Sequence, residues 1–209
     1  MRGVLELPES GMVGASQQKY APLSIEAFRK WVASRPDEER WELIDGTPMM
    51  MAPPTRDHQR IASNLERLLN DAIERSQIKR AAHWAAYQRI GVNLGPIVQH
   101  YDPEPDVAVV EVAKGADPRY SDHFFLAAEV VSPSDLLTID GKRELYKRHP
   151  DCRCVLVIRQ DRYEVNIELR TPDGWVRETL SAPRDQLVLP AFGLKCSLMD
   201  IYKGTIGTA

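Results

Sequence analysis

Two short apolar stretches of the chain each carry one carboxylate. They read Pro105-Asp106-Val-Ala-Val-Val-Glu-Val112 and Phe124-Phe-Leu-Ala-Ala-Glu129-Val-Val131. Charged side chains are rarely buried unless they are paired or bound to a cation, so Asp106 and Glu129 each need a partner. If residues 113–122 connect the two stretches as a hairpin, the antiparallel register places Asp106 directly opposite Glu129. Their β-carbons would then lie about 5 Å apart.

Two carboxylates at that distance repel each other and raise one pKa, unless a cation lies between them. Oxygen ligands without clustered histidines or cysteines favour a hard cation that keeps water and phosphate in its remaining positions. We therefore predict that Asp106 and Glu129 are ligands of Mg²⁺, for which Mn²⁺ can substitute.

The segment Asp140-Gly-Lys142-Arg-Glu-Leu-Tyr146 follows, and we expect a helix over residues 140–149. Lys142 and Tyr146 are four residues apart, so they share one face of that helix. Phosphodiester hydrolysis builds negative charge on the phosphoryl oxygens, which a metal ion and an adjacent ammonium stabilise. Lys142 has the chemistry for this role, and Tyr146 is predicted to hydrogen-bond a phosphate or the lysine.

Two further polar residues lie in apolar surroundings. Asp45-Gly46 between two apolar runs predicts a hairpin, and its first strand carries Glu42 between Trp41 and Leu43. A long helix is expected over residues 56–75, with Thr55 as its cap. His58 lies in its first turn, on the side of the core stripe.

Together these segments resemble the PD-(D/E)XK nuclease superfamily, and more closely the Uma-type family of restriction-like endonucleases. They run in the family's order between about residues 22 and 202: Trp41–Gly46, His58, Pro105–Val107, Ala128–Ser134, Asp140–Tyr146 and Leu189–Gly193. The resemblance implies an α+β (α/β-like) fold with a restriction-endonuclease-like core, in which a mixed central β-sheet is flanked by helices. It also implies metal-dependent DNA cleavage.

For the site, the resemblance implies Asp106 and Glu129 as metal ligands, Lys142 as the active-site lysine and Glu42 as a further acidic member. His58 matches a position that is frequently histidine in that family. We therefore take Asp106, Glu129, Lys142, Glu42, Tyr146 and His58 as the candidate catalytic residues.

The chain departs from the family pattern at two places. A strict motif would place the lysine at position 131, where this chain has Val131, so Lys142 must act from the following helix. The next strand usually reads Glu-Tyr-Trp, whereas this chain has Cys154-Val-Leu-Val-Ile-Arg159. We interpret the second departure as a packing change.

Each candidate also has a purely structural interpretation. Asp106 can be a turn residue after proline, and Glu129 can form an ion pair with Lys142 or Arg143. Glu42 can be an exposed hairpin residue, and His58 a first-turn residue whose hydrogen bonds are satisfied by its neighbours. Tyr146 can be an aromatic residue at the edge of the core. The basic run Lys142, Arg143, Lys147 and Arg148 is either a solvated helix face or a surface that steers a phosphate backbone. Tyr163–Arg170 alternates strictly, which predicts a half-exposed strand with Glu168 facing solvent.

Composition is that of an ordinary globular protein. The 209 residues predict one domain over residues 20–209, preceded by a flexible N-terminal arm over residues 1–19. A formal net charge of −3 gives no global attraction to nucleic acid, so any DNA contact must come from local groups. Three cysteines do not form a disulfide framework, and we find no signal peptide or membrane span. A cytoplasmic location is expected.

The leading functional hypothesis is a Mg²⁺-dependent endonuclease acting on DNA. The alternative is a catalytically silent nuclease-fold protein that serves as a nucleic-acid-binding or assembly module. A third hypothesis, an acid/base hydrolase of the glycosidase type, leaves Lys142 without a task. A homodimer or higher homo-oligomer would allow cuts on both strands of the DNA, but the sequence alone does not identify an interface.

Overall fold

The computed structural model describes residues 22–76, 83–112, 117–133 and 135–205. The predicted arm over residues 1–19 and Ser134 lie outside the described residues. The elements in chain order are α1 (Ile25–Val32), β1 (Trp41–Ile44), β2 (Thr47–Met50), α2 (Arg56–Arg75), β3 (Trp84–Tyr87), β4 (Gly91–Val92), β5 (Val107–Glu111), β6 (Tyr120–Ser121), β7 (Phe124–Val131), α3 (Leu136–Arg148), β8 (Cys154–Arg159), β9 (Val165–Thr171), β10 (Gly174–Leu180), β11 (Gln186–Leu189), η2 (Pro190–Phe192), β12 (Leu194–Ser197) and α4 (Leu198–Ile201).

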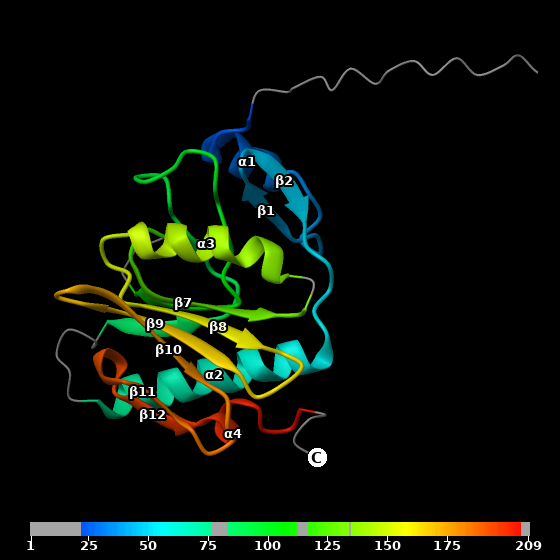
Figure 1. Ribbon diagram of the computed structural model, residues 1–209. Helices are drawn as coiled ribbons and strands as arrows, with labels where there is room; N and C mark the ends of the chain where they lie inside the picture. Colours follow the sequence, from blue (N-terminus) through cyan, green and yellow to red (C-terminus); the bar gives the residue numbers. More distant parts are fainter. Residues whose placement is uncertain (1–21, 77–82, 113–116, 134, 206–209) are drawn as a thin grey trace, which may run out of the picture.

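A six-stranded sheet forms the centre of the molecule, in the order β10-β9-β8-β7-β5-β3. β7 and β8 run parallel, and the other neighbouring strands run antiparallel. Parallel neighbours need a crossover connection, and α3 provides it between β7 and β8. This mixed sheet between helices confirms the predicted fold class (Figure 1).

Different helices cover the two faces of the sheet (Figure 1). α2 lies on one face with β11, β12 and α4, and its Ile61, Leu65 and Leu69 are fully buried there. α3 covers the opposite face, where Tyr146 packs with Phe124. Because side chains alternate along a strand, residues of β7 point in turn toward α2 and α3.

The N-terminal elements α1, β1 and β2 form a small unit beside the segment that leads into β5. Asp45 and Gly46 both have positive φ, 47° and 73°, as a two-residue hairpin turn requires. The guanidinium of Arg29 donates two hydrogen bonds to buried Asp102, at 2.8 and 2.7 Å. Leu43 of β1 pairs with Asp102 through backbone hydrogen bonds. The hairpin that carries Glu42 is thereby fastened next to β5.

The predicted helices and hairpins are largely confirmed, with two corrections. α2 begins at its predicted cap, where the Thr55 hydroxyl accepts the backbone N–H of His58 at 3.2 Å. α3 begins at Leu136 rather than at residue 140, because Ile139 is buried against Val131 and extends the apolar contact of the helix.

The second correction concerns Glu168 of β9, which is buried rather than exposed. Its carboxylate lies 2.9 Å from Arg143 Nε, 2.7 Å from Lys147 Nζ and 2.6 Å from an Arg177 terminal nitrogen. Three cations compensate the desolvation that would otherwise keep this side chain in water. Arg143 and Lys147 therefore bind α3 to the sheet, and the basic run is not a free solvated face.

Candidate active site

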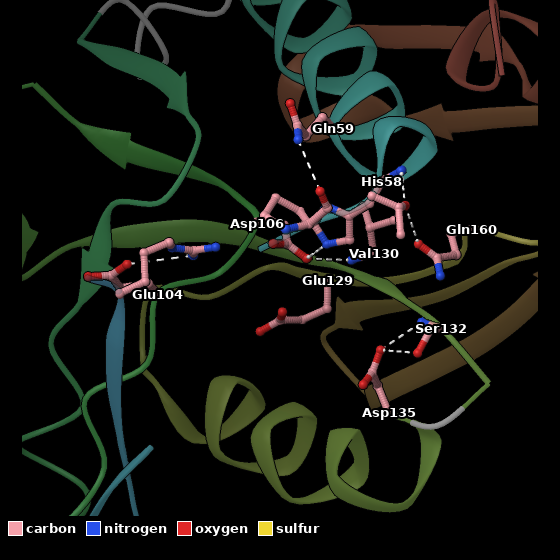
Figure 2. Close-up of polar contacts among 12 residues, drawn as sticks. His58, Gln59, Glu104, Asp106, Glu129, Val130, Ser132, Asp135 and Gln160 are labelled. Atoms are coloured by element: carbon pink, nitrogen blue, oxygen red, sulfur yellow. Dashed lines mark hydrogen bonds and ion pairs between the residues drawn. The ribbon is translucent and has the colours of Figure 1, made fainter. Parts of the chain in front are cut away.

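Asp106 and Glu129 lie side by side at one end of the sheet. β5 and β7 pair with Val107 opposite Ala128 and Ala108 opposite Ala127, which confirms the predicted antiparallel register. One position further, the same register places Asp106 opposite Glu129. The Asp106 Oδ2 atom accepts the backbone N–H of Val130 at 2.8 Å, so the first carboxylate is tied directly to the strand of the second (Figure 2).

α3 brings Lys142 and Tyr146 over Glu129. The Tyr146 hydroxyl donates a hydrogen bond to Glu129 Oε1 at 2.7 Å, and Lys142 Nζ lies 3.5 Å from the same oxygen. The spacing of these two residues along the helix accounts for this, since positions i and i+4 face the same neighbour. Tyr146 is fully buried, and its partner is Glu129 rather than the predicted phosphate or lysine.

Glu42 reaches the same lysine from β1. Its Oε2 atom lies 2.6 Å from Lys142 Nζ, and its Oε1 atom accepts the backbone N–H of Glu104 at 3.1 Å. Glu42 is only 1% exposed, so it is not an exposed hairpin residue. Lys142 thus lies between two buried carboxylates that come from different strands.

His58 contacts the remaining carboxylate. Its Nε2 atom lies 3.0 Å from Asp106 Oδ2, and Figure 2 shows it at the start of α2, next to Asp106. The Nδ1 atom of His58 is buried and has no hydrogen-bond partner among the described residues. The structure therefore brings all six predicted residues into one connected cluster.

The cluster holds three buried carboxylates against one ammonium. The pKa of Glu129 is raised to about 8, chiefly by burial and also by Asp106 and Glu42, while Lys142 and Tyr146 oppose that rise. The pKa of Lys142 is raised in spite of its burial, because Glu129 and Glu42 stabilise the ammonium. Burial and the neighbouring carboxylates also raise the pKa of the Tyr146 hydroxyl. The cluster therefore has an excess of negative charge that an added cation would neutralise.

A cavity of about 470 Å³ opens over these groups. Of the six predicted residues it is lined by Glu42, His58, Asp106, Glu129 and Lys142. On one side its wall is apolar, formed by Met49, Met51, Pro53 and Pro54. Acidic groups and a lysine thus face a space in which a substrate can reach them.

The donor set fits a hard divalent cation. Asp106 and Glu129 supply carboxylate oxygens side by side. The pKa of Glu129 is raised because the site disfavours its negative charge, which a bound metal ion would stabilise. Within the described ranges there is no cluster of three or more histidine, cysteine or acidic side chains with metal-binding geometry. A metal ion here would take two protein carboxylates and complete its shell with water and substrate, as Mg²⁺ commonly does.

Arg40 and Glu104 are two of the cavity-lining residues that were not predicted from the sequence. Arg40 lies just before β1 and Glu104 lies two residues before Asp106, and a terminal nitrogen of Arg40 lies 3.6 Å from Glu104 Oε2. Their place in the sequence beside Glu42 and Asp106 was a signal that could have identified them. Strand β8, which departs from the family pattern, is buried along its whole length and contributes no residue to the cavity. Its altered sequence therefore affects the packing of the core and not the lining of the cavity.

Among the described helices, none combines the length and the apolar composition that crossing a bilayer requires.

Similarity to known proteins agrees with this geometry. The family model Uma2, described as "Putative restriction endonuclease", matches residues 25–199. A solved structure described as a "putative nuclease belonging to DUF820", from Anabaena variabilis, superimposes with a TM-score of 0.65 at 18% identity. That alignment covers 87% of this chain and 98% of the other. No curated protein matches the chain. The match over most of its length shows that this chain belongs to the Uma2 family of restriction-endonuclease-like proteins.

Proposed function

We propose that this protein is a metal-dependent endonuclease that hydrolyses phosphodiester bonds of DNA. Asp106 and Glu129 hold Mg²⁺ or Mn²⁺, and Lys142 assists the attacking water and stabilises the transition state. The observation that carries the proposal is the position of Lys142, whose ammonium lies 3.5 Å from the Glu129 carboxylate beside Asp106 in an open cavity. Family membership supports the reaction class.

The bound metal ion would polarise a phosphoryl oxygen and lower the pKa of a coordinated water. The chain's own residues do the positioning. The backbone N–H of Val130 and the Nε2 atom of His58 both contact Asp106 Oδ2, so they orient this carboxylate. Tyr146 holds Glu129 through its hydroxyl in the same way.

Lys142 has two tasks in this proposal. Its ammonium donates hydrogen bonds toward the water that attacks phosphorus, and it stabilises the charge that develops on the phosphoryl oxygens. Glu42 keeps the ammonium charged and directed toward the cavity, because its Oε2 atom lies only 2.6 Å from Nζ. Glu42 is therefore a positioning residue for Lys142.

The test is a cleavage assay on supercoiled and linear plasmid DNA with Mg²⁺, with Mn²⁺, or with a chelator. We expect nicking that requires the metal and falls at least about 100-fold in Asp106→Asn and Lys142→Met. Asp173→Asn and Lys195→Gln are matched controls, since both residues are exposed and neither lines the cavity. Full activity in Asp106→Asn would refute the proposal.

Metal binding is measured separately by calorimetric titration with Mn²⁺. Asp106→Asn and Glu129→Gln are expected to lose binding, whereas Asp173→Asn retains it. DNA binding by the wild type without cleavage under any metal would instead favour the catalytically silent, nucleic-acid-binding alternative.

A further inference from the structure

Arg40 has donors that the protein does not use. Its side chain lines the cavity and is 18% exposed, yet its only ion-pair contact among the described residues is the 3.6 Å approach to Glu104. The Nε atom is buried and has no hydrogen-bond partner in the described part of the chain. A guanidinium carries five N–H donors in a planar fork, so the single approach to Glu104 leaves Arg40 with donors for a ligand in the cavity.

Arg89 lies at the same end of the sheet. β3 pairs with β5 as far as Tyr87 opposite Ala108, and beyond the strand the backbone N–H of Val92 donates to the Pro103 carbonyl at 3.2 Å. Arg89 lies between these two contacts, so its backbone runs beside the start of β5 near Asp106. The start of β5 at Asp106 thus has β7 with Glu129 on one side and the segment that carries Arg89 on the other. Arg89 is exposed, and no ion pair to it is found among the described residues.

The backbone at Arg89 is strained. Its φ is 56°, in the left-handed region that residues other than glycine, asparagine and aspartate seldom adopt. Strained backbone of this kind clusters at functional sites, where the position of a side chain matters more than local stability.

Arg40 and Arg89 both lie beside the segment that leads into β5, because Arg40 approaches Glu104 at 3.6 Å and the Arg89 segment runs next to residues 103–108. Partial desolvation lowers the pKa of the exposed Arg89 and the charge of Arg40 lowers it further, while Asp106 and Glu104 act in the opposite direction. Arg89 therefore lies within electrostatic reach of both Arg40 and the acidic cluster. Two guanidiniums held near each other gain from an anion that they share.

We propose that Arg40 and Arg89 together bind one internal phosphodiester of a DNA strand, next to the bond that is cleaved at Asp106 and Glu129. This inference rests on the proposed function and names the groups that hold the substrate. The need for such a site follows from charge, because the protein has a formal net charge of −3 and the cavity is acidic. Local arginines are required to attract a polyanion to this surface.

The test measures binding of fluorescently labelled DNA duplexes, about 30 base pairs long, as a function of salt, in Ca²⁺ to occupy the oxygen ligands. Arg40→Gln and Arg89→Gly are compared with Arg75→Gln, an exposed control at the other end of α2. Arg75 is roughly 26 Å along the helix from His58. Arg89→Gly is chosen because glycine accepts the left-handed backbone and the variant therefore folds. Thermal unfolding of every variant verifies the fold.

We expect each variant at the proposed site to weaken binding on the order of tenfold. The slope of log K against log salt should fall by about 0.9 in the double variant, as expected when the protein neutralises one phosphate fewer. Arg75→Gln should leave both quantities unchanged. Unchanged affinity and slope in folded Arg40→Gln and Arg89→Gly would overturn the inference.

The DNA is prepared with and without 5′-phosphates. An effect of the variants seen only with 5′-phosphorylated ends would also overturn the inference, because the site would then bind a terminal phosphate. Cleavage is measured in parallel with Mg²⁺. Arginine-dependent binding without any wild-type cleavage upholds this inference while the proposed nuclease function fails, so the two failures are distinguishable.

Discussion

Glu42 on β1 and Lys142 on α3 form an ion pair in which Oε2 and Nζ are 2.6 Å apart. This contact holds the Lys142 ammonium between the carboxylates of Glu42 and Glu129. Position 131, where a strict motif has its lysine, holds a valine that is buried against Ile139 and Val157. An apolar core residue therefore occupies the usual lysine position, and Lys142 of α3, the helix that packs on Val131, places the ammonium near Glu129 instead.

The first prediction tests the Glu42–Lys142 pair. Lys142→Met should lower the single-turnover cleavage rate by about 10²- to 10³-fold, because it removes the donor that stabilises the transition state. Glu42→Gln should have a smaller effect, about tenfold, because the lysine keeps Glu129 as a partner. Rapid-quench measurement at saturating DNA gives both rates. A larger loss in Glu42→Gln than in Lys142→Met would contradict the assigned roles.

The second prediction concerns pH and Glu129. Its pKa is raised from 4.5 to about 8 in the folded protein, so between these values the folded state binds more protons than the unfolded state. The free energy of unfolding of the metal-free protein must then decrease as pH rises through this window. In Glu129→Gln this contribution is absent, and the pH dependence should be flatter.

Urea unfolding in a chelator at four pH values spanning this window measures the difference. Glutamine keeps an oxygen that accepts the Tyr146 hydroxyl hydrogen bond, so the comparison isolates the charge. Parallel curves for the wild type and Glu129→Gln would show that Glu129 is ionised throughout. Because a metal ligand must be deprotonated, Mn²⁺ affinity should rise with pH up to about 8.

The third prediction concerns the buried Glu168. Glu168→Gln should lower the free energy of unfolding by about 3 kcal/mol, since it leaves Arg143 and Lys147 without their shared carboxylate. Although burial alone would raise the pKa of Glu168, hydrogen bonds from Lys147 and Arg177 lower it. Its stabilising contribution is therefore present above the unfolded pKa and is lost as pH falls below about 4.5.

Urea denaturation at neutral pH and at a pH below the unfolded pKa checks both parts of this prediction. Glu178→Gln is the matched control, because Glu178 is exposed on the neighbouring strand β10. If the two variants lost equal stability at neutral pH, the buried ion cluster would not hold α3 on the sheet.

The fourth prediction separates stability from binding at Arg89. Arg89→Gly should raise the free energy of unfolding by about 1 kcal/mol, because glycine adopts a φ of 56° without the cost of a side chain. Arg89→Asn should be close to neutral, since asparagine tolerates this conformation better than arginine. Chemical denaturation at neutral pH provides the measurement. A loss of stability in Arg89→Gly would mean that the arginine side chain makes contacts that outweigh the backbone strain.

Much of this site could be predicted from local sequence patterns. The two apolar strands and the length between them determined the register that sets Asp106 opposite Glu129, because a shift by one residue would turn every apolar side chain to the wrong face. Thr55 and the spacing of Lys142 and Tyr146 determined the helix start and the shared helix face. Each of these features depends on neighbours within one element or one hairpin.

Other features depend on contacts between elements that are distant in sequence, and only the tertiary structure decided them. Glu168 follows the alternation of an exposed strand residue, yet α3 and β10 cover it with three cations. Neither Arg40 nor Arg89 belongs to a recognisable sequence motif. They reach this end of the sheet because β1 and the end of β3 both pack near the start of β5. A sequence pattern reports which face of an element is apolar, whereas the partner of a charged side chain is chosen by how those faces pack together.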